Sequence, residues 1–261
     1  MHGKKPTVLL TNDDGYQAAG LRALADHLKA IANVKIIAPS SERSGAAQSL
    51  TLRQPIVCHK VADDEWAIDG TPADCVIVAL HGLLKERPDM VISGINHGAN
   101  LGENVYYSGT VGAAREAVIH YVPGFAISLC SKRVDADFTP TARLACDTVQ
   151  LILREKLPAQ VLLNINVPET WGGDVKITRQ SKKITRTVLR EGADPRGCPY
   201  FWLSEQRLDR EMEIDADSDY AAIFAGEASV NPLHLDPTHS ESLNHLSHWA
   251  DLLTNKKALS S

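Results

Sequence analysis

Short apolar runs alternate with stretches of helical spacing over the first two thirds of the chain. Five of these runs are typical of buried strands: residues 8–10, 34–38, 88–93, 125–129 and 161–165. Further segments are predicted as helices after the first run and at residues 71–84, 111–120 and 139–155, and as a short hairpin at residues 50–61 and 65–68. Short strands joined by helices predict an α/β fold, with a mostly parallel sheet flanked by helices.

The pattern changes after residue 168. The elements predicted there are strands at 175–178 and 185–189, a loop at 191–197, an aromatic strand from Tyr200, a short helix at 219–224, a strand at 228–235 and an amphipathic helix at 241–253. This part shows no clear core of its own, so we predict a core over residues 1–169 and a C-terminal extension of hairpin, strand and helix over residues 170–261. Such hairpins and tails often cross to another subunit, and we expect this extension to serve oligomerisation.

Composition narrows the class of protein. The chain has 261 residues, of which 44% are hydrophobic and 23% charged, and its net charge is −5. This acidic balance gives no support to nucleic-acid binding, which favours a basic surface. The five cysteines contain no Cys-x-x-Cys pair, and no segment reaches the roughly 20 apolar residues that a membrane span needs. We therefore predict a cytoplasmic protein with reduced cysteines that binds neither nucleic acid nor membrane.

Two adjacent carboxylates follow the first apolar run. Residues 11–15 are Thr-Asn-Asp-Asp-Gly, so Asp13 and Asp14 come directly after the predicted strand. The carboxyl ends of parallel strands are where open α/β sheets place their ligands. Two like charges repel, and burying them is costly unless a cation or hydrogen bonds compensate. The pair therefore predicts a metal or catalytic site, although an Asx turn before a helix would suit the same residues.

Three more polar stretches are expected at the same edge of the sheet. They are residues 38–45 with Ser44, residues 93–102 with Asn96 and Asn100, and residues 107–115 with Ser108, Gly109 and Thr110. Carboxylate, hydroxyl and carboxamide oxygens suit Mg²⁺ or Mn²⁺. A Ser-Gly-Thr turn at a helix N-terminus suits an anion. A divalent cation beside an anion cradle predicts phosphoryl transfer to water.

Together these motifs resemble the survival protein SurE family. The matching blocks run in order over nearly the whole chain: residues 11–15, 38–45, 70–75, 93–100, 107–114, 164–168, 194–197 and 229–233. The resemblance implies a Rossmann-like core and a metal-dependent phosphatase of nucleoside 5′- and 3′-monophosphates, with short polyphosphate as a further substrate. It also implies one divalent ion per subunit, Mg²⁺ or Mn²⁺, and a homodimer or homotetramer that exchanges C-terminal segments.

The resemblance assigns roles to individual residues. It implies a metal shell made of Asp13, Asp14, Ser44 and Asn96. Around the phosphate and the rest of the substrate, the expected residues are Asn12, Asn100, Ser108, Gly109 and Thr110. As a hypothesis for the mechanism, Asp13 or Asp14 is catalytic, because either carboxylate could orient the attacking water or take its proton.

Three alternatives stay open. An aspartyl-phosphate phosphatase would use Asp13 as nucleophile, but it would favour Asp-x-Asp over an adjacent pair. A dinucleotide-binding oxidoreductase would need Gly-x-Gly-x-x-Gly after the first strand, which this sequence lacks. A non-catalytic module that senses nucleotides would use the same pocket and would bind nucleotide without releasing phosphate.

Overall fold

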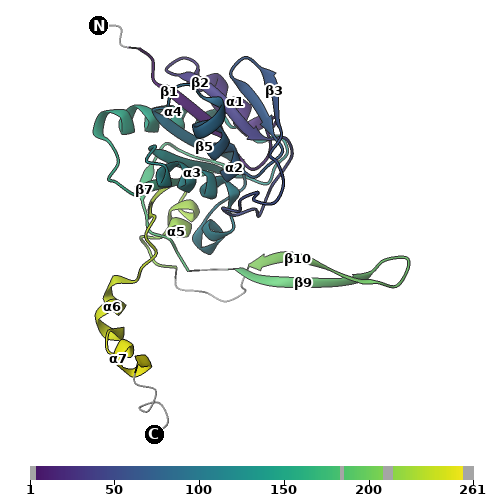
Figure 1. The fold of residues 1–261 in the computed structure, drawn as a ribbon, viewed down its shortest axis with the longest axis vertical. Helices are drawn as coiled ribbons and strands as arrows, with labels where there is room; N and C mark the ends of the chain where they lie inside the picture. Colours follow the sequence, from purple (N-terminus) through teal and green to yellow (C-terminus); the bar gives the residue numbers. More distant parts are fainter. Residues whose placement is uncertain (1–3, 183–184, 208–213, 255–261) are drawn as a thin grey trace.

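The fold is built on a nine-stranded sheet with helices on both faces (Figure 1). The structure is a computed structural model that describes residues 4–182, 185–207 and 214–254. Across the sheet the strands follow the order β3 (Cys58–Ala62), β4 (Glu65–Ile68), β2 (Asn33–Pro39), β1 (Thr7–Thr11), β5 (Met90–His97), β6 (Gly124–Cys130), β7 (Val161–Pro168), β11 (Ala228–His234) and β8 (Val175–Ile177). The β3–β4 and β7–β11 pairs are antiparallel, and the other pairs of this sheet are parallel. The prediction of a mostly parallel sheet flanked by helices is confirmed.

Alternating side chains of β1 divide the core into two layers. Val8 and Leu10 pack on one face of the sheet with α1 (Ala19–Leu28) and α4 (Thr139–Glu155). Leu9 packs on the other face with α2 (Pro72–Val78) and α3 (Gly109–Ile119). All three side chains are fully buried. A strand covered on both faces is apolar throughout, which explains the unbroken run in the sequence.

Local signals set where the helices begin. Thr71 caps α2 by accepting the N–H of Asp74, whose carboxylate accepts the N–H of Thr71 in return. Ser108 caps α3 by accepting the N–H of Val111, so α3 begins at Gly109, earlier than the predicted start at residue 111. Helix α2 continues into the π-helical turn η1 (Ala79–Leu83). None of the helices in the described ranges has both the length and the apolar character needed to cross a membrane.

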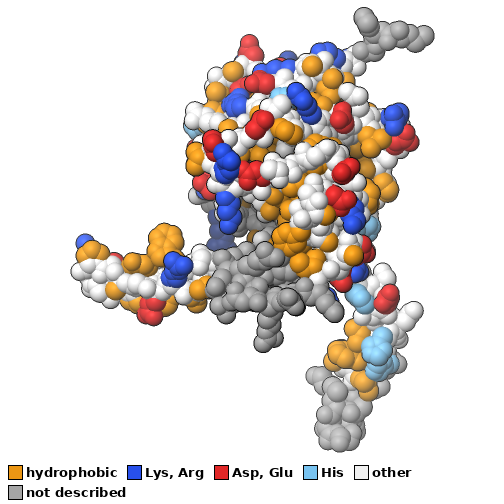
Figure 2. Space-filling view, turned by 180° about the vertical axis from the view of Figure 1, so that it is seen from behind, with side chains coloured by type: hydrophobic (Ala, Val, Ile, Leu, Met, Phe, Trp, Pro, Cys, Tyr) orange, Lys and Arg blue, Asp and Glu red, His pale blue; other side chains and the backbone are white. Residues whose placement is uncertain are grey.

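Part of the C-terminal extension joins the sheet and part projects from it. β8 and β11 complete the sheet beside β7, and α5 (Asp219–Phe224) packs against this edge. β9 (Thr185–Ala193) and β10 (Pro199–Arg207) form a separate antiparallel hairpin that projects from the body (Figure 1). Figure 2 shows hydrophobic side chains along this hairpin, where Phe201 is 57% and Trp202 70% exposed. The division of the chain between residues 169 and 170 stays a prediction.

Two predicted elements differ in the structure. Residues 50–57 are not a strand, because Thr51 donates its N–H and its hydroxyl to the Asp74 carboxylate and Pro55 has no N–H to donate. The single helix predicted near the C-terminus is instead two, α6 (Ser240–Leu246) and α7 (Trp249–Thr254). Between them the Ser247 hydroxyl donates to the Asn244 carbonyl and competes with the helical backbone bonds.

Candidate active site

The chain turns sharply where β1 ends at the carboxyl edge of the sheet. The amide nitrogen of Asn12 donates to the Gly15 carbonyl at 2.9 Å, and its amide oxygen accepts the Gly15 N–H at 3.2 Å. Gly15 has a φ of +100°, a backbone conformation that favours glycine. The Asx-turn interpretation therefore applies to Asn12, whose amide shapes the turn; a substrate-binding role for Asn12 stays a prediction. Asp13 and Asp14 lie inside that turn and point to two different elements.

Asp13 lies buried against the first turn of α3. Its side chain is 4% exposed, and its Oδ1 accepts a hydrogen bond from the Thr110 hydroxyl. A Cβ atom at Gly109 would come within 2.9 Å of the Asp13 side chain, so this approach requires a glycine. Burial raises the pKa of Asp13 from 3.8 to about 6; the bond from Thr110 lowers it, and the charge of Asp14 raises it. Burial is therefore the main reason why the charged form of Asp13 is unfavourable.

Asp14 faces the end of β5. Its Oδ2 accepts the backbone N–H of His97 at 3.1 Å. Burial raises its pKa, and the charge of Glu42 adds to this increase while the His97 bond opposes it. Among the described residues, no lysine or arginine forms an ion pair with Asp13 or Asp14. The two carboxylates thus form a negative site at the carboxyl edge of the sheet.

Ser44 reaches this edge from the loop after β2. The Arg43 N–H donates to the Asp13 carbonyl at 2.7 Å, which ties this loop to the carboxylate turn. Ser44 is the next residue and is exposed, and its hydroxyl donates to the Glu42 carboxylate at 2.8 Å. The structure therefore brings the predicted hydroxyl ligand to the same turn as Asp13 and Asp14.

Asn96 lies within β5, whereas the sequence predicts a loop from residue 93. The pairing of β5 with β6 changes register between Ser93 and Asn96. The shift depends on Gly94, which has a φ of +135° and where a Cβ would meet the Ile127 carbonyl oxygen at 2.2 Å. The amide nitrogen of Asn96 donates to the Gly98 carbonyl at 2.8 Å, so the amide oxygen is the atom that a cation would contact.

The predicted anion cradle lies at the start of α3. The Ser108 side chain is buried, and its hydroxyl accepts the Val111 N–H at 3.1 Å. The Thr110 hydroxyl is bonded to Asp13. The Thr110 hydroxyl hydrogen is therefore used within the protein, whereas the Ser108 hydroxyl accepts a bond and keeps its own hydrogen to donate. The N–H groups of Val111 and Gly112 are bonded to Ser108, so this end of α3 offers a phosphate the Ser108 hydroxyl, the Gly109 N–H and the helix dipole.

Asn100, which the sequence predicts as a phosphate ligand, is buried. It is 7% exposed, and its amide nitrogen donates to the Ser128 hydroxyl at 2.8 Å. The Asn100 N–H donates to the Asn166 side chain at 2.8 Å, and the Asn100 carbonyl accepts from Asn164 at 2.8 Å and from Asn166 at 3.1 Å. This arrangement favours a positioning role for Asn100. Sequence reasoning missed the roles of Asn164 and Asn166, because it identifies them as part of a strand end and a family motif and not as partners of a distant loop.

The loop that carries Ser44 is also held against α3. The Ala47 N–H donates to the Tyr107 carbonyl at 3.1 Å, and Gln48 donates to the buried Glu116 carboxylate at 2.6 Å. A Cβ at Gly112 would come within 2.4 Å of the Ala47 carbonyl oxygen. Gly112, near the start of the predicted helix, is the sequence signal that could have indicated this close approach.

The donor atoms at this edge fit a hard divalent cation. Within the described ranges, no group of three or more His, Cys, Asp and Glu side chains gathers to hold a metal. The predicted shell of two carboxylates, one amide oxygen and one hydroxyl instead has the oxygen donors that Mg²⁺ and Mn²⁺ prefer. Two desolvated carboxylates without a cationic side chain are the feature that such an ion would stabilise.

The fold defines an α/β protein whose candidate site lies at the carboxyl ends of parallel strands, the edge at which open α/β sheets bind their ligands. A family model described as Survival protein SurE matches residues 8–187. The 5′-nucleotidase SurE of Geotalea daltonii is 40% identical over 245 residues, which cover 93% of this chain and 98% of that protein. The protein of the same name from Vibrio parahaemolyticus is 41% identical over 253 residues, with coverage of 95% and 96%. The chain belongs to the SurE family.

A solved structure agrees with this assignment. The crystal structure of the SurE protein from Aquifex aeolicus matches this fold with a TM-score of 0.82 and 37% sequence identity. The match covers 94% of this chain and 100% of that chain. The sheet, the carboxylate turn and most of the C-terminal extension therefore fall within the region of similarity.

Proposed function

We propose that this chain is a 5′-nucleotidase, a phosphoric monoester hydrolase that releases phosphate from nucleoside monophosphates. Relatives that match nearly the whole chain bear the name 5′-nucleotidase SurE. The observation that carries the proposal is the buried Asp13, which lies next to Asp14 and against the N-terminus of α3. A cation at the carboxylates and an anion at the helix N-terminus would be neighbours there, as phosphoryl transfer requires.

The finer proposal concerns the metal and the range of substrates. Each subunit would use one divalent ion, Mg²⁺ or Mn²⁺, and would act on nucleoside 3′-monophosphates and short polyphosphate as well as on 5′-monophosphates. Asp13, Asp14, Ser44 and Asn96 are the residues that would hold this ion. Their oxygen chemistry and their common location at one edge of the sheet support this part of the proposal.

The chain's own groups would divide the remaining work. When bound, a divalent ion neutralises phosphate oxygens in the transition state and lowers the pKa of a water ligand. Asp13 or Asp14 orients the attacking water or takes its proton. Thr110 holds Asp13 in place through its bond to Oδ1. The start of α3 holds the phosphate oxygens with the Gly109 N–H and the Ser108 hydroxyl, and Asn100 positions the segment that leads to this helix.

The test is the release of inorganic phosphate from a panel of substrates. The panel contains 5′- and 3′-nucleoside monophosphates, a short polyphosphate and a sugar phosphate, each with Mn²⁺, with Mg²⁺ and with EDTA. We expect release from nucleoside monophosphates that EDTA abolishes and that added Mn²⁺ or Mg²⁺ restores. Folded protein that binds nucleotide but releases no phosphate with either metal would contradict the proposal and would favour the nucleotide-sensing alternative.

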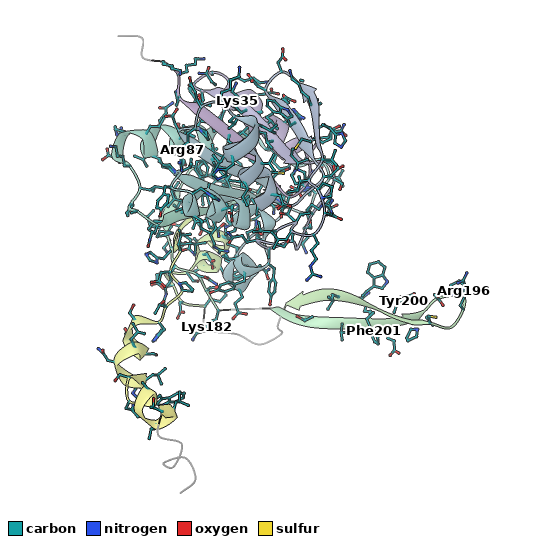
Figure 3. The ribbon with its side chains drawn as sticks, in the orientation of Figure 1. Lys35, Arg87, Lys182, Arg196, Tyr200 and Phe201 are labelled. Atoms are coloured by element: carbon teal, nitrogen blue, oxygen red, sulfur yellow. The ribbon has the colours of Figure 1, made fainter. Side chains whose placement is uncertain are left out.

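We further infer that the chain forms a homodimer or homotetramer through the projecting hairpin. Figure 3 shows Tyr200 and Phe201 on this hairpin, with Arg196 near its tip. Exposed apolar side chains on a projecting arm favour burial against another copy of the chain. Light scattering should give the mass of a dimer or tetramer, and the double substitution Phe201→Ser and Trp202→Ser should shift it towards the monomer. A monomeric native chain would contradict this inference.

A further inference from the structure

Two histidines meet at the end of α3 that lies away from the carboxylate turn. His81 comes from η1, and His120 caps the C-terminus of α3. The Nε2 atom of His81 lies 3.3 Å from the Nδ1 atom of His120, with ring centroids 4.8 Å apart and ring planes at 66°. The two residues are 39 positions apart in the sequence, so it is the packing of α3 against the segment after α2 that brings their rings together.

A buried carboxylate orients one of the two rings. The Nε2 atom of His120 lies 3.1 Å from Oε1 of Glu116, a residue that is 6% exposed. Because a carboxylate accepts hydrogen bonds, Nε2 of His120 carries the hydrogen and Nδ1 presents its lone pair to His81. In metal sites a ligating histidine usually donates its other N–H to a carboxylate in this way. Glu116 is fixed in turn, because its Oε2 accepts a hydrogen bond from Gln48 at 2.6 Å.

We propose that His81 and His120 bind a transition-metal ion of the Zn²⁺ type. Two nitrogens bound to one tetrahedral zinc ion at its usual distances lie about 3.3–3.4 Å apart, and the two imidazole nitrogens are 3.3 Å apart here. Imidazole suits Zn²⁺, Ni²⁺ and Cu²⁺ rather than Mg²⁺. His81 is exposed and the His120 side chain is 29% exposed, so water can reach the ion and complete its coordination.

Binding would need little rearrangement at this site. The hydrogen that lies between the rings moves from Nε2 of His81 to Nδ1 of the same ring, so both rings stay neutral and present a lone pair to the ion. The bond from His120 to Glu116 is kept. The structure thus already holds one ligand in the required tautomer, which lowers the cost of ordering it.

The proposed zinc site is separate from the oxygen ligands of the candidate active site. The helix between them has 11 residues, which corresponds to a length of about 16 Å. Its N-terminal end meets carboxylate, hydroxyl and amide oxygens, and its C-terminal end meets imidazole nitrogens. An excess of Mg²⁺ should therefore occupy the oxygen ligands without displacing zinc from the histidines.

The experiment titrates Zn²⁺ into the full-length, untagged chain in an excess of Mg²⁺, with a chromogenic chelator as competitor. Every sample carries Asp13→Asn, so that a zinc ion at the carboxylate turn does not dominate the result. We expect His81→Gln and His120→Gln each to weaken the tightest Zn²⁺ binding at least tenfold. Glu116→Gln, which keeps the shape of the side chain but removes the charge that orients His120, should weaken it by about 10-fold.

A second histidine pair of this chain serves as the matched control. The rings of His245 and His248 have centroids 6.5 Å apart near the C-terminus. The double variant His245→Gln and His248→Gln should keep the tight Zn²⁺ binding, and urea unfolding should show that all variants are folded. Unchanged binding in His81→Gln, or loss of the tight site in the tail variant instead, would overturn the proposal. Neither result would bear on phosphate release, which the substrate panel measures separately.

Discussion

Two buried carboxylates next to helix N-termini, Asp74 and Asp13, have very different surroundings in this fold. Asp74, at the start of α2, is 2% exposed, and it accepts hydrogen bonds from the Thr71 N–H and from both the N–H and the hydroxyl of Thr51. Asp13, beside the start of α3, is 4% exposed and accepts bonds from the Thr110 hydroxyl and from backbone N–H groups of Asp13 and Thr110, yet its pKa is raised to about 6. The first carboxylate is satisfied by donors of its own chain. The second is desolvated and lies beside a like charge.

Asp219 shows that the satisfied case is the rule for structural carboxylates here. It is fully buried at the start of α5, and its oxygens accept the N–H groups of Gly102 and Ser181. A buried charge usually persists because donors surround it. Asp13 and Asp14 also accept hydrogen bonds, but burial outweighs these bonds and raises the pKa of both carboxylates. The difference supports the proposal that these two carboxylates bind an external cation, and it leads to predictions of decreasing size.

The largest expected effect is the loss of catalysis on replacing Asp13. Asp13→Asn keeps the size of the side chain and the oxygen that accepts the Thr110 bond, but it removes the charge. We expect kcat/KM for a nucleoside 5′-monophosphate to fall by a factor on the order of 10²–10⁴ at saturating Mn²⁺. Asp63→Asn is the control, because that carboxylate is 99% exposed and outside the site. Steady-state phosphate release measures both variants, and near-native activity of Asp13→Asn would remove the basis of the assignment.

Asp74 should show the opposite behaviour, with a large effect on folding. Asp74→Ala removes the cap of α2 and leaves the donors of Thr51 and Thr71 without their partner. We expect the free energy of unfolding to fall by about 2–4 kcal/mol, as measured by urea titration. Asp74→Asn, which keeps one acceptor oxygen, should lose less. Equal stability of Asp74→Ala and the native chain would show that this carboxylate is not the structural counterpart of Asp13.

The pH dependence of stability should report the burial of Asp13 directly. In metal-free protein the pKa of folded Asp13 is about 6 against an ordinary 3.8, so the folded state holds this proton more tightly than the unfolded state does. The resulting stability is fully present below about pH 4 and is lost as pH rises through 6, to an extent of at most about 3 kcal/mol. In EDTA, Asp13→Asn should therefore be more stable than the native chain at pH 7.5, by about 1–3 kcal/mol. Urea titrations at several pH values should show this gap closing towards pH 4, and a gap independent of pH would contradict the argument.

Local signals in the sequence predicted much of this architecture. The apolar run of β1, the Thr71 cap and the 139–155 helix depend on residues close in sequence, and each is found where it was predicted. The convergence of the Asp13 turn with the Asn96 strand and the start of α3 followed from one general rule, that parallel strands end at one edge.

What the sequence did not predict depends on contacts between distant segments. Residues 50–57 leave the sheet because Asp74 binds Thr51, 23 positions away. Asn166 accepts a hydrogen bond from Asn100, which is 66 positions away. The sequence shows that Asn166 is polar and follows a predicted buried strand, but it does not show which residue Asn166 contacts. A periodic pattern predicts which face of a helix or strand is buried, but it does not predict which side chains of other elements pack against that face.

The smallest effect should come from the contact that joins the Ser44 loop to α3. Gln48→Ala removes the donor to Glu116 but touches neither carboxylate of the active site. A bond of this kind is worth about 1 kcal/mol, so we expect a rise of a few-fold in the Mn²⁺ concentration that gives half-maximal activity, with kcat nearly unchanged. Gln17→Ala is the control, because Gln17 is exposed and bonds only its neighbour Tyr16 among the described contacts.

Gln48→Glu sharpens the same test. It places a second carboxylate against Glu116 and should push the Ser44 loop away from α3, so its effect on the metal dependence should exceed that of Gln48→Ala. The order native, Gln48→Ala, Gln48→Glu in the Mn²⁺ requirement would show that the cation site depends on bonds between separate elements. Equal metal dependence in all three would mean that Asp13 and Asp14 hold the ion without help from this loop, and Ser44 would then be removed from the proposed shell.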